Sequence, residues 1–172
     1  ISNEAKAYHN SAIQSEKLLA DPSLLSIKEA VGIANLIGEI DAPVLLFIED
    51  NKDVLHYLID CLKADYQIIT ALNGEEGIKI ALEKTPDLII SDIMMREMDG
   101  YEVCHTLKST EQTAHIPIIL LTAKANQSSK IEGLRQGADA YLTKPFDELE
   151  LKVRLQQLLK LRRDLQTHYQ QK

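Results

Sequence analysis

The fold is decided by Leu88-Ile89-Ile90-Ser91-Asp92-Ile93-Met94-Met95, a run that Met98-Asp99-Gly100 soon follows. Four apolar or small residues that end in one carboxylate predict a buried strand that delivers Asp92 to its open end. The other charged and hydroxyl residues of interest also stand at the ends of apolar runs. We therefore expect one site to collect them.

Apolar runs also predict the other strands of the sheet, at residues 44–48, 66–71, 116–122 and 140–144. The central strand is expected to start at Pro86, where a missing N–H costs little. Amphipathic helices are expected between the strands, after Asn51, after Asn73-Gly74, after Gly100, through Ile131 and Leu134 to Gly137, and from Leu151 to Tyr169.

Strands that alternate with helices and are apolar on both faces require a parallel sheet that is covered on both sides. Crossovers are right-handed almost without exception, which favours a doubly wound arrangement. We predict an α/β fold, with a doubly wound five-stranded parallel sheet in a three-layer α/β/α sandwich and helical extensions at both ends.

Charged and hydroxyl side chains gather at one edge of this predicted sheet. Glu49-Asp50, Asp92, Thr122 and Lys144 each stand at the carboxyl end of a different strand. Ligands bind outside the carboxyl ends of the strands in such sheets. Four independent placements therefore agree on one site.

The residue types at this edge favour phosphoryl chemistry. Neighbouring carboxylates repel one another, so they need protons or a cation, and oxygen donors in an open site suit Mg²⁺. The ionised carboxylate of Asp92 can attack phosphorus once a metal ion and the Lys144 ammonium offset the charge of the phosphoryl oxygens. The Thr122 hydroxyl can donate a hydrogen bond to one of those oxygens.

Residues 43–161 resemble the receiver domain of two-component response regulators. The marks of the resemblance are Glu49-Asp50, the segment from Asp92-Ile93-Met94-Met95 to Met98-Asp99-Gly100, Leu121-Thr122-Ala123 and Lys144-Pro145-Phe146. The resemblance implies the flavodoxin-like strand order 2-1-3-4-5. It also implies phosphoryl transfer from the phosphohistidine of a histidine kinase, and a cis bond between Lys144 and Pro145.

The resemblance assigns roles to individual residues. Mg²⁺ would be held by Asp50, Asp92 and the backbone carbonyl of Met94, with Glu49 acting directly or through water. Lys144 would pair with the phosphoryl group. Thr122 and Tyr141 would be the switch residues, which repack the face made by the domain's fourth helix, fifth strand and fifth helix. That face or the C-terminal helix is the candidate surface for a homodimer.

Two positions depart from the family pattern. Arg96 stands where a proline is common four residues after the phosphoacceptor, which can alter the loop or add a charge for partner docking. Glu49 stands where many members have Asp, so its reach to the ion is longer.

Three other functions are alternatives that the sequence leaves open. An aspartyl-nucleophile phosphatase needs a second acid two residues after the nucleophile, and Met94 occupies that position. A flavodoxin-like FMN carrier needs a hydroxyl- and glycine-rich loop where Glu49-Asp50-Asn51 stands. A receiver that serves only as an unphosphorylated docking platform is the third rival. As an isolated domain, a receiver catalyses only its own phosphorylation and dephosphorylation.

The flanking segments predict that the receiver is embedded in a larger protein. Residues 1–42 are expected to form a helical linker or connector, and residues 162–172 a helical tail. The last helix carries an apolar seam interrupted at Arg162, and it either frays beyond the sheet or continues as a coiled linker. We expect a hybrid sensor histidine kinase, with its catalytic domain upstream and a DNA-binding module as a candidate downstream.

Charge and cysteine content narrow the remaining function classes. The formal net charge of −7 argues against direct nucleic-acid binding by this segment, and no apolar run is long enough for a membrane role. Cys61 and Cys104 lack metal-ligand spacing and are expected to be reduced thiols in the cytoplasm. The parent protein can still be anchored in a membrane.

Overall fold

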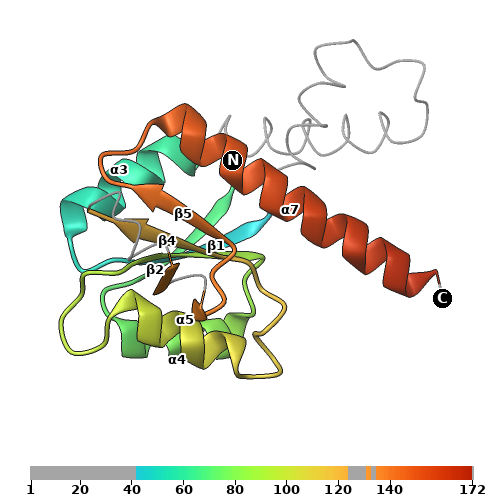
Figure 1. Ribbon diagram of the computed structural model, residues 1–172. Helices are drawn as coiled ribbons and strands as arrows, with labels where there is room; N and C mark the ends of the chain where they lie inside the picture. The colour runs from blue at the N-terminus through green and yellow to red at the C-terminus, as the bar shows by residue number, and fades with distance from the viewer. Residues whose placement is uncertain (1–41, 124–130, 133–134, 172) are drawn as a thin grey trace, which may run out of the picture. The chain divides into compact units, whose positions relative to one another are not determined.

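The chain forms a five-stranded, all-parallel sheet whose strands lie in the order β2-β1-β3-β4-β5 (Figure 1). This computed structural model describes residues 42–123, 131–132 and 135–171. The strands are β1 (Val44–Ile48), β2 (Gln67–Ala71), β3 (Leu88–Asp92), β4 (Ile118–Thr122) and β5 (Ala140–Thr143). The predicted fold class and strand order are confirmed.

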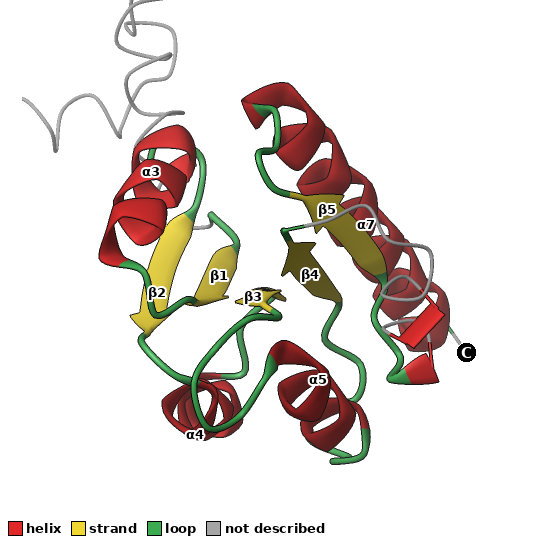
Figure 2. Cartoon of the chain, turned by 60° about the vertical axis from the view of Figure 1, so that its left-hand side comes forward, coloured by secondary structure: helices red, strands yellow, loops and turns green. Residues whose placement is uncertain are grey.

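Four described helices cover the two faces of the sheet (Figure 2). They are α3 (Lys52–Leu62), α4 (Gly74–Lys84), α5 (Gly100–Lys108) and α7 (Glu148–Gln170). Leu45 and Phe47 of β1 point to the cluster that includes α3 and α7, whereas Leu46 and Ile48 point to the cluster that includes α4 and α5. Because side chains alternate along a strand, a continuously apolar strand supplies both cores, which gives the three layers.

Polar side chains fix where three of these helices begin. Asn51 accepts hydrogen bonds from the Asp53 and Val54 amides, and Asn73 accepts one from the Glu76 amide. Asp99 forms a capping box with Glu102 at the start of α5. Such caps satisfy amides that have no partner within the helix, so the chain turns sharply from each strand edge into the next helix.

Three strands are shorter at their start than the sequence pattern indicated. β2 begins at Gln67 rather than at Tyr66, β3 at Leu88 rather than at Pro86, and β4 at Ile118, directly after Pro117. Proline has no N–H to donate to a strand ladder, which is consistent with the later starts of β3 and β4.

Two predicted parts of the chain lie outside the described residues, wholly or in part. The helices expected in residues 1–42 fall there, apart from Ala42, and so does most of the helix expected before Gly137. The proposed repacking face includes that helix, so it is only partly described. The division into residues 1–42, 43–161 and 162–172 stays a prediction.

The last helix, α7, is longer than the sheet that it covers. Its buried residues are Leu151, Leu155 and Leu159, whereas Leu165 and Tyr169 farther along are exposed. The first half therefore packs on the sheet and the second half projects beyond it. Within the described part of the chain, no helix combines the length and hydropathy needed to span a membrane.

Candidate functional site

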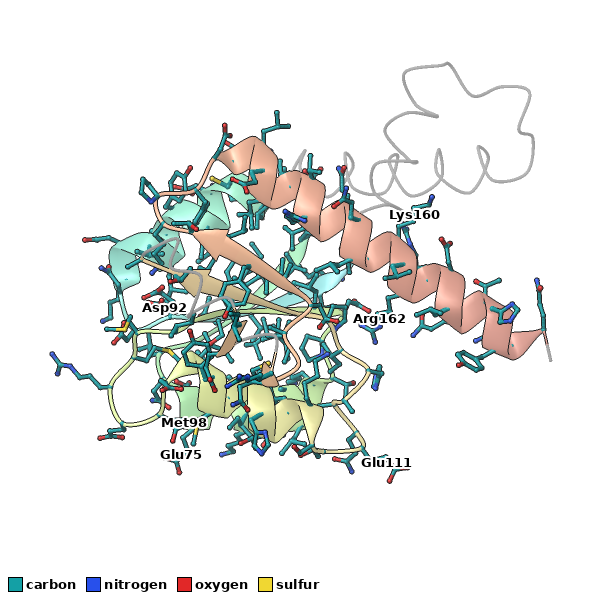
Figure 3. All side chains as sticks on the ribbon, in the orientation of Figure 1. Glu75, Asp92, Met98, Glu111, Lys160 and Arg162 are labelled. Atoms are coloured by element: carbon teal, nitrogen blue, oxygen red, sulfur yellow. The ribbon has the colours of Figure 1, made fainter. Side chains whose placement is uncertain are left out.

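Asp92 is the last residue of β3 and lies at the carboxyl edge of the sheet (Figure 3). Its side chain is only 7% exposed. One carboxylate oxygen, Oδ1, accepts a hydrogen bond from the Met94 amide at 3.3 Å. The other, Oδ2, lies 3.0 Å from the Lys144 ammonium, so both oxygens have partners on the protein.

Lys144 joins two carboxylates that come from different strands. Its Nζ lies 2.9 Å from Oε2 of Glu49 and 3.0 Å from Oδ2 of Asp92. Partial burial disfavours the ammonium, but the hydrogen bonds to Glu49 and Asp92, together with the negative charges of these carboxylates, outweigh burial and raise the Lys144 pKa. The group therefore stays charged at neutral pH. The bond from Lys144 to Pro145 is cis, as the resemblance implied.

Glu49 is almost fully buried, with 1% of its surface exposed. Burial raises its pKa, and the hydrogen bonds from Lys144 and from the Asn51 amide offset part of that rise. The Asn51 amide donates to Oε1 at 3.0 Å. The donor is a backbone amide, which does not depend on the residue type. The sequence therefore could not predict that one Glu49 oxygen already accepts a hydrogen bond.

Three carboxylates at this edge are close enough to share a cation. One oxygen each from Glu49, Asp50 and Asp92 lie within 4.8 Å of one another, and Asp50 is exposed to solvent. Three carboxylates and one ammonium carry a formal charge of −2, which a divalent ion balances. An oxygen-only donor set that is open to water fits Mg²⁺.

Met94 and Thr122 lie beside Asp92, whereas Tyr141 lies farther back along β5, in register with Leu120. Met94 is 72% exposed and donates its amide to Asp92, so its side chain projects into solvent. Thr122 ends β4 and is buried, and its carbonyl accepts the Lys144 amide at 2.6 Å. Tyr141 is half-buried on β5 and packs against the α4 and α5 side of the core. The structure thus gathers the predicted residues at one edge, except Tyr141, which lies two residues before the end of β5.

Gly100 allows the loop after Asp92 to pack closely. A Cβ on Gly100 would overlap the backbone carbonyl of Asp92, and it would also contact the Cα of Ile93. The Gly100 amide donates to the Ile93 carbonyl at 3.0 Å. Gly100 therefore fixes the loop that carries Met94. The sequence indicated Gly100 only as the last residue of the motif Met98-Asp99-Gly100 and did not predict this close packing.

An apolar groove of about 530 Å³ borders the site at Lys144. Tyr57 of α3 and Phe146 of the loop before α7 line it, with their ring centroids 5.9 Å apart. Its other lining residues are Asp53, Val54, Ala123 and Pro145. Sequence reasoning missed this surface because Val54 and Phe146 occupy positions that also suit core packing.

Comparison with known proteins agrees with the fold and the site. The family model described as the response regulator receiver domain matches residues 45–156. Histidine kinase P4 from Formosa agariphila is 38% identical over 145 residues, which is 84% of this chain and 11% of that protein. The chain thus spans about a tenth of that relative's length.

Solved structures of kinase receiver domains are also similar to this chain. The signal receiver domain of a signal transduction histidine kinase from Syntrophus aciditrophicus has a TM-score of 0.65 and 36% identity, over 69% of this chain and 91% of that one. The receiver domain of the sensor histidine kinase PA1611 from Pseudomonas aeruginosa has a TM-score of 0.65 and 28% identity, over 69% and 98%. That structure has a magnesium ion coordinated in its active site cleft.

Proposed function

The chain belongs to the response regulator receiver domain family of two-component signalling, and we propose that Asp92 is its phosphoryl acceptor. The donor would be the phosphohistidine of a histidine kinase domain. One observation carries the proposal: the Asp92 carboxylate ends a central strand in contact with the Lys144 ammonium and beside two more carboxylates. This arrangement pairs a nucleophile with the charges that phosphoryl transfer requires.

The transfer step needs no general base. An Asp92 oxygen attacks phosphorus, the bond between phosphorus and the donor histidine nitrogen breaks, and the imidazole leaves with that electron pair. Lys144 would stabilise the added negative charge, and the 3.0 Å between its Nζ and Asp92 Oδ2 supports this role. Thr122 would donate its hydroxyl to a phosphoryl oxygen from the end of β4.

Glu49, Asp50, Asp92 and the Met94 carbonyl are the residues that we propose hold Mg²⁺. The ion would supply positive charge near the phosphoryl oxygens. The close approach of the three carboxylates and their uncompensated formal charge support this assignment. Since one Glu49 oxygen accepts the Asn51 amide and the other the Lys144 ammonium, Glu49 would act on the ion through water.

Phosphorylation would be transmitted through Thr122 and Tyr141. Thr122 lies at the end of β4 in register with Thr143, the residue before Lys144. Tyr141 is half-buried on β5, in register with Leu120 of β4, two residues before Thr122. We propose that movement of Thr122 toward the phosphoryl group draws Tyr141 inward and changes the surface around β5.

The apolar groove beside Lys144 is the surface that we propose for the phosphodonor domain. A helix that carries a phosphohistidine must bring its imidazole to Asp92, and the groove of Val54, Tyr57 and Phe146 borders the same lysine. Apolar contacts there would hold the helix without neutralising the charges of the site.

The distal half of α7 is the surface that we propose for a second copy. Leu161, Leu165 and Tyr169 are exposed at intervals of four residues, which forms a ridge on the helix. In an antiparallel pair centred on Leu165, Leu161 of one copy faces Tyr169 of the other. A contact of a few helical turns buries much less than ~800 Å² per partner, so the dimer would be weak.

The parent protein that we propose is a hybrid histidine kinase, with residues 1–42 as a connector and residues 162–172 as a helical tail. The similarity to histidine kinase P4 supports this assignment. We place the domain in the cytoplasm, where kinase phosphodonor domains operate.

The proposed function can be tested with a small phosphodonor. The chain is incubated with acetyl phosphate, with and without Mg²⁺, and the intact mass is measured for the wild type and for Asp92→Asn. We expect the gain of one phosphoryl group that requires both Mg²⁺ and Asp92. Absence of any gain in the presence of bound Mg²⁺ would favour an unphosphorylated docking domain, and rapid net hydrolysis of acetyl phosphate would favour a phosphatase.

A further inference from the structure

The distal half of α7, residues 160–170, extends past the last buried leucine of the helix. Leu159 is 6% exposed, and no later residue of the described helix is buried. The packed first half nucleates the helix, so residues 160–170 need only to extend it, but an exposed extension frays without tertiary contacts. A further contact would hold this segment on the domain.

Arg162 supplies such a contact at the edge of the sheet opposite Asp92 (Figure 3). Its side chain is only 13% exposed, and its Nη1 donates to the carbonyls of Pro86 and Asp87, at 3.3 Å and 2.5 Å. The same nitrogen lies 3.3 Å from the Asp87 carboxylate. Hydrogen bonds from a charged donor are stronger than neutral ones, so one side chain holds α7 to the loop before β3.

Asp87 links this contact to the beginning of the sheet. Its Oδ2 accepts the amide of Val44, the first residue of β1, at 2.7 Å. Its own amide donates to the Val44 carbonyl at 2.8 Å. The start of β1, the start of β3 and the distal half of α7 therefore meet at one aspartate.

We propose that Arg162 and Asp87 form a clasp that keeps residues 160–170 helical and fixed against the edge where β1 begins. The clasp sets the direction in which the chain leaves the domain relative to where it enters. Because both groups lie at the opposite edge from Asp92, the clasp acts whether or not Asp92 accepts a phosphoryl group.

The geometry explains why Arg occupies a position in the otherwise apolar seam of α7. Leu158 precedes Arg162 by one turn and Leu165 follows it, and all three line a groove of about 580 Å³ with Pro117 and His115. A leucine at position 162 would fill the seam but leave two carbonyls without this donor. Lys108 does not serve this acceptor, because its ammonium is bound to Asp139 at 2.8 Å.

Hydrogen exchange of the 172-residue chain tests the clasp. The variants are Arg162→Met, which keeps the apolar stem, Arg162→Lys, which keeps the charge, and Arg163→Met as the control on an exposed neighbour. Loss of a charged hydrogen bond should speed exchange in residues 160–170 by about tenfold or more in Arg162→Met. Arg162→Lys should be intermediate, and Arg163→Met should match the wild type.

The comparison peptides cover residues 148–159 and strand β3, whose exchange should not change. Measurement at two protein concentrations separates the clasp from self-association. Unchanged exchange of residues 160–170 in Arg162→Met would overturn the proposal. Equal acceleration of all peptides would also overturn it, because Arg162 would then support global stability rather than a local joint.

Discussion

Replacement of Lys144 by Met should show how strongly the stability of the folded domain depends on the Lys144 ammonium. The substitution keeps an apolar stem but removes the hydrogen bonds to Glu49 and Asp92. Glu49 is 1% exposed, so its ionised carboxylate would be left buried without its cation. Breaking a buried pair in this way costs about 3–5 kcal/mol, and the partial exposure of Lys144 favours the lower end, about 3 kcal/mol near pH 8.

The loss of unfolding free energy in Lys144→Met should depend on pH in metal-free solution. Burial already raises the pKa of Glu49, and Lys144 opposes that rise, so the variant should have a still higher Glu49 pKa. A carboxyl group whose pKa is higher in the folded than in the unfolded chain loses stability as pH rises from the unfolded value, about 4.3, through the folded value. The deficit of the variant should therefore shrink to about 1 kcal/mol near pH 5.

Urea denaturation in EDTA at pH 5 and pH 8 measures this difference. Lys152→Met is the matched control, because Lys152 pairs with Glu148 on the surface of α7, and no change is expected for it. If Lys144→Met loses the same unfolding free energy relative to the wild type at both pH values, the buried Glu49 charge is not the cause of the destabilisation.

Further predictions concern a loop, a helix end, a thiol and an interface. Gly100→Ala should destabilise the domain by about 2 kcal/mol in urea denaturation, because its Cβ meets the Asp92 carbonyl; no loss would refute the close packing. Thr85→Gly should stabilise it by about 1 kcal/mol, because Thr85 ends α4 with φ +42°; a lower denaturation midpoint would contradict this. Burial raises the pKa of Cys104 to about 11, so a thiol reagent at pH 8 should modify Cys61 first, and equal rates would argue otherwise. In sedimentation velocity, Leu165→Glu should abolish the weak self-association that Leu149→Glu retains, and persistence in both would exclude this surface.

Much of the fold follows from patterns that the sequence carries locally. Continuous apolar runs such as Val44–Ile48 can be buried only on both faces, which requires helices on both sides of a parallel sheet. Asn51, Asn73 and Asp99 mark helix starts by side-chain chemistry, and each caps the helix that was expected after it. Local signals of this kind do not depend on distant partners.

The candidate site could be assembled from the sequence because its side chains end different strands. Parallel strands place their carboxyl ends at one edge, so the sequence alone predicts that Asp50, Asp92, Thr122 and Lys144 lie together. The contact of Lys144 with Glu49 could not be predicted in the same way. It depends on the rotamers of two side chains that are 95 residues apart.

The role of Arg162 is a second feature that the sequence concealed. A single arginine in an apolar seam suggests an interruption of a coiled segment, and its acceptors are mainly backbone carbonyls, which every residue has. Only the packing of α7 across the sheet brings position 162 to Asp87. A side chain that binds distant backbone atoms cannot be paired with its acceptor from the sequence, because every residue has the same carbonyl group.

Chemical trapping identifies the residue that accepts the phosphoryl group. After incubation with acetyl phosphate and Mg²⁺, borohydride reduces an aspartyl phosphate to homoserine, and peptide mass mapping locates the product. If Asp92 is the acceptor, homoserine appears at position 92, and neither Glu49 nor Asp50 is converted to the corresponding alcohol. Trapping at another residue, or no trapped product from a protein that has gained phosphate, would contradict this assignment.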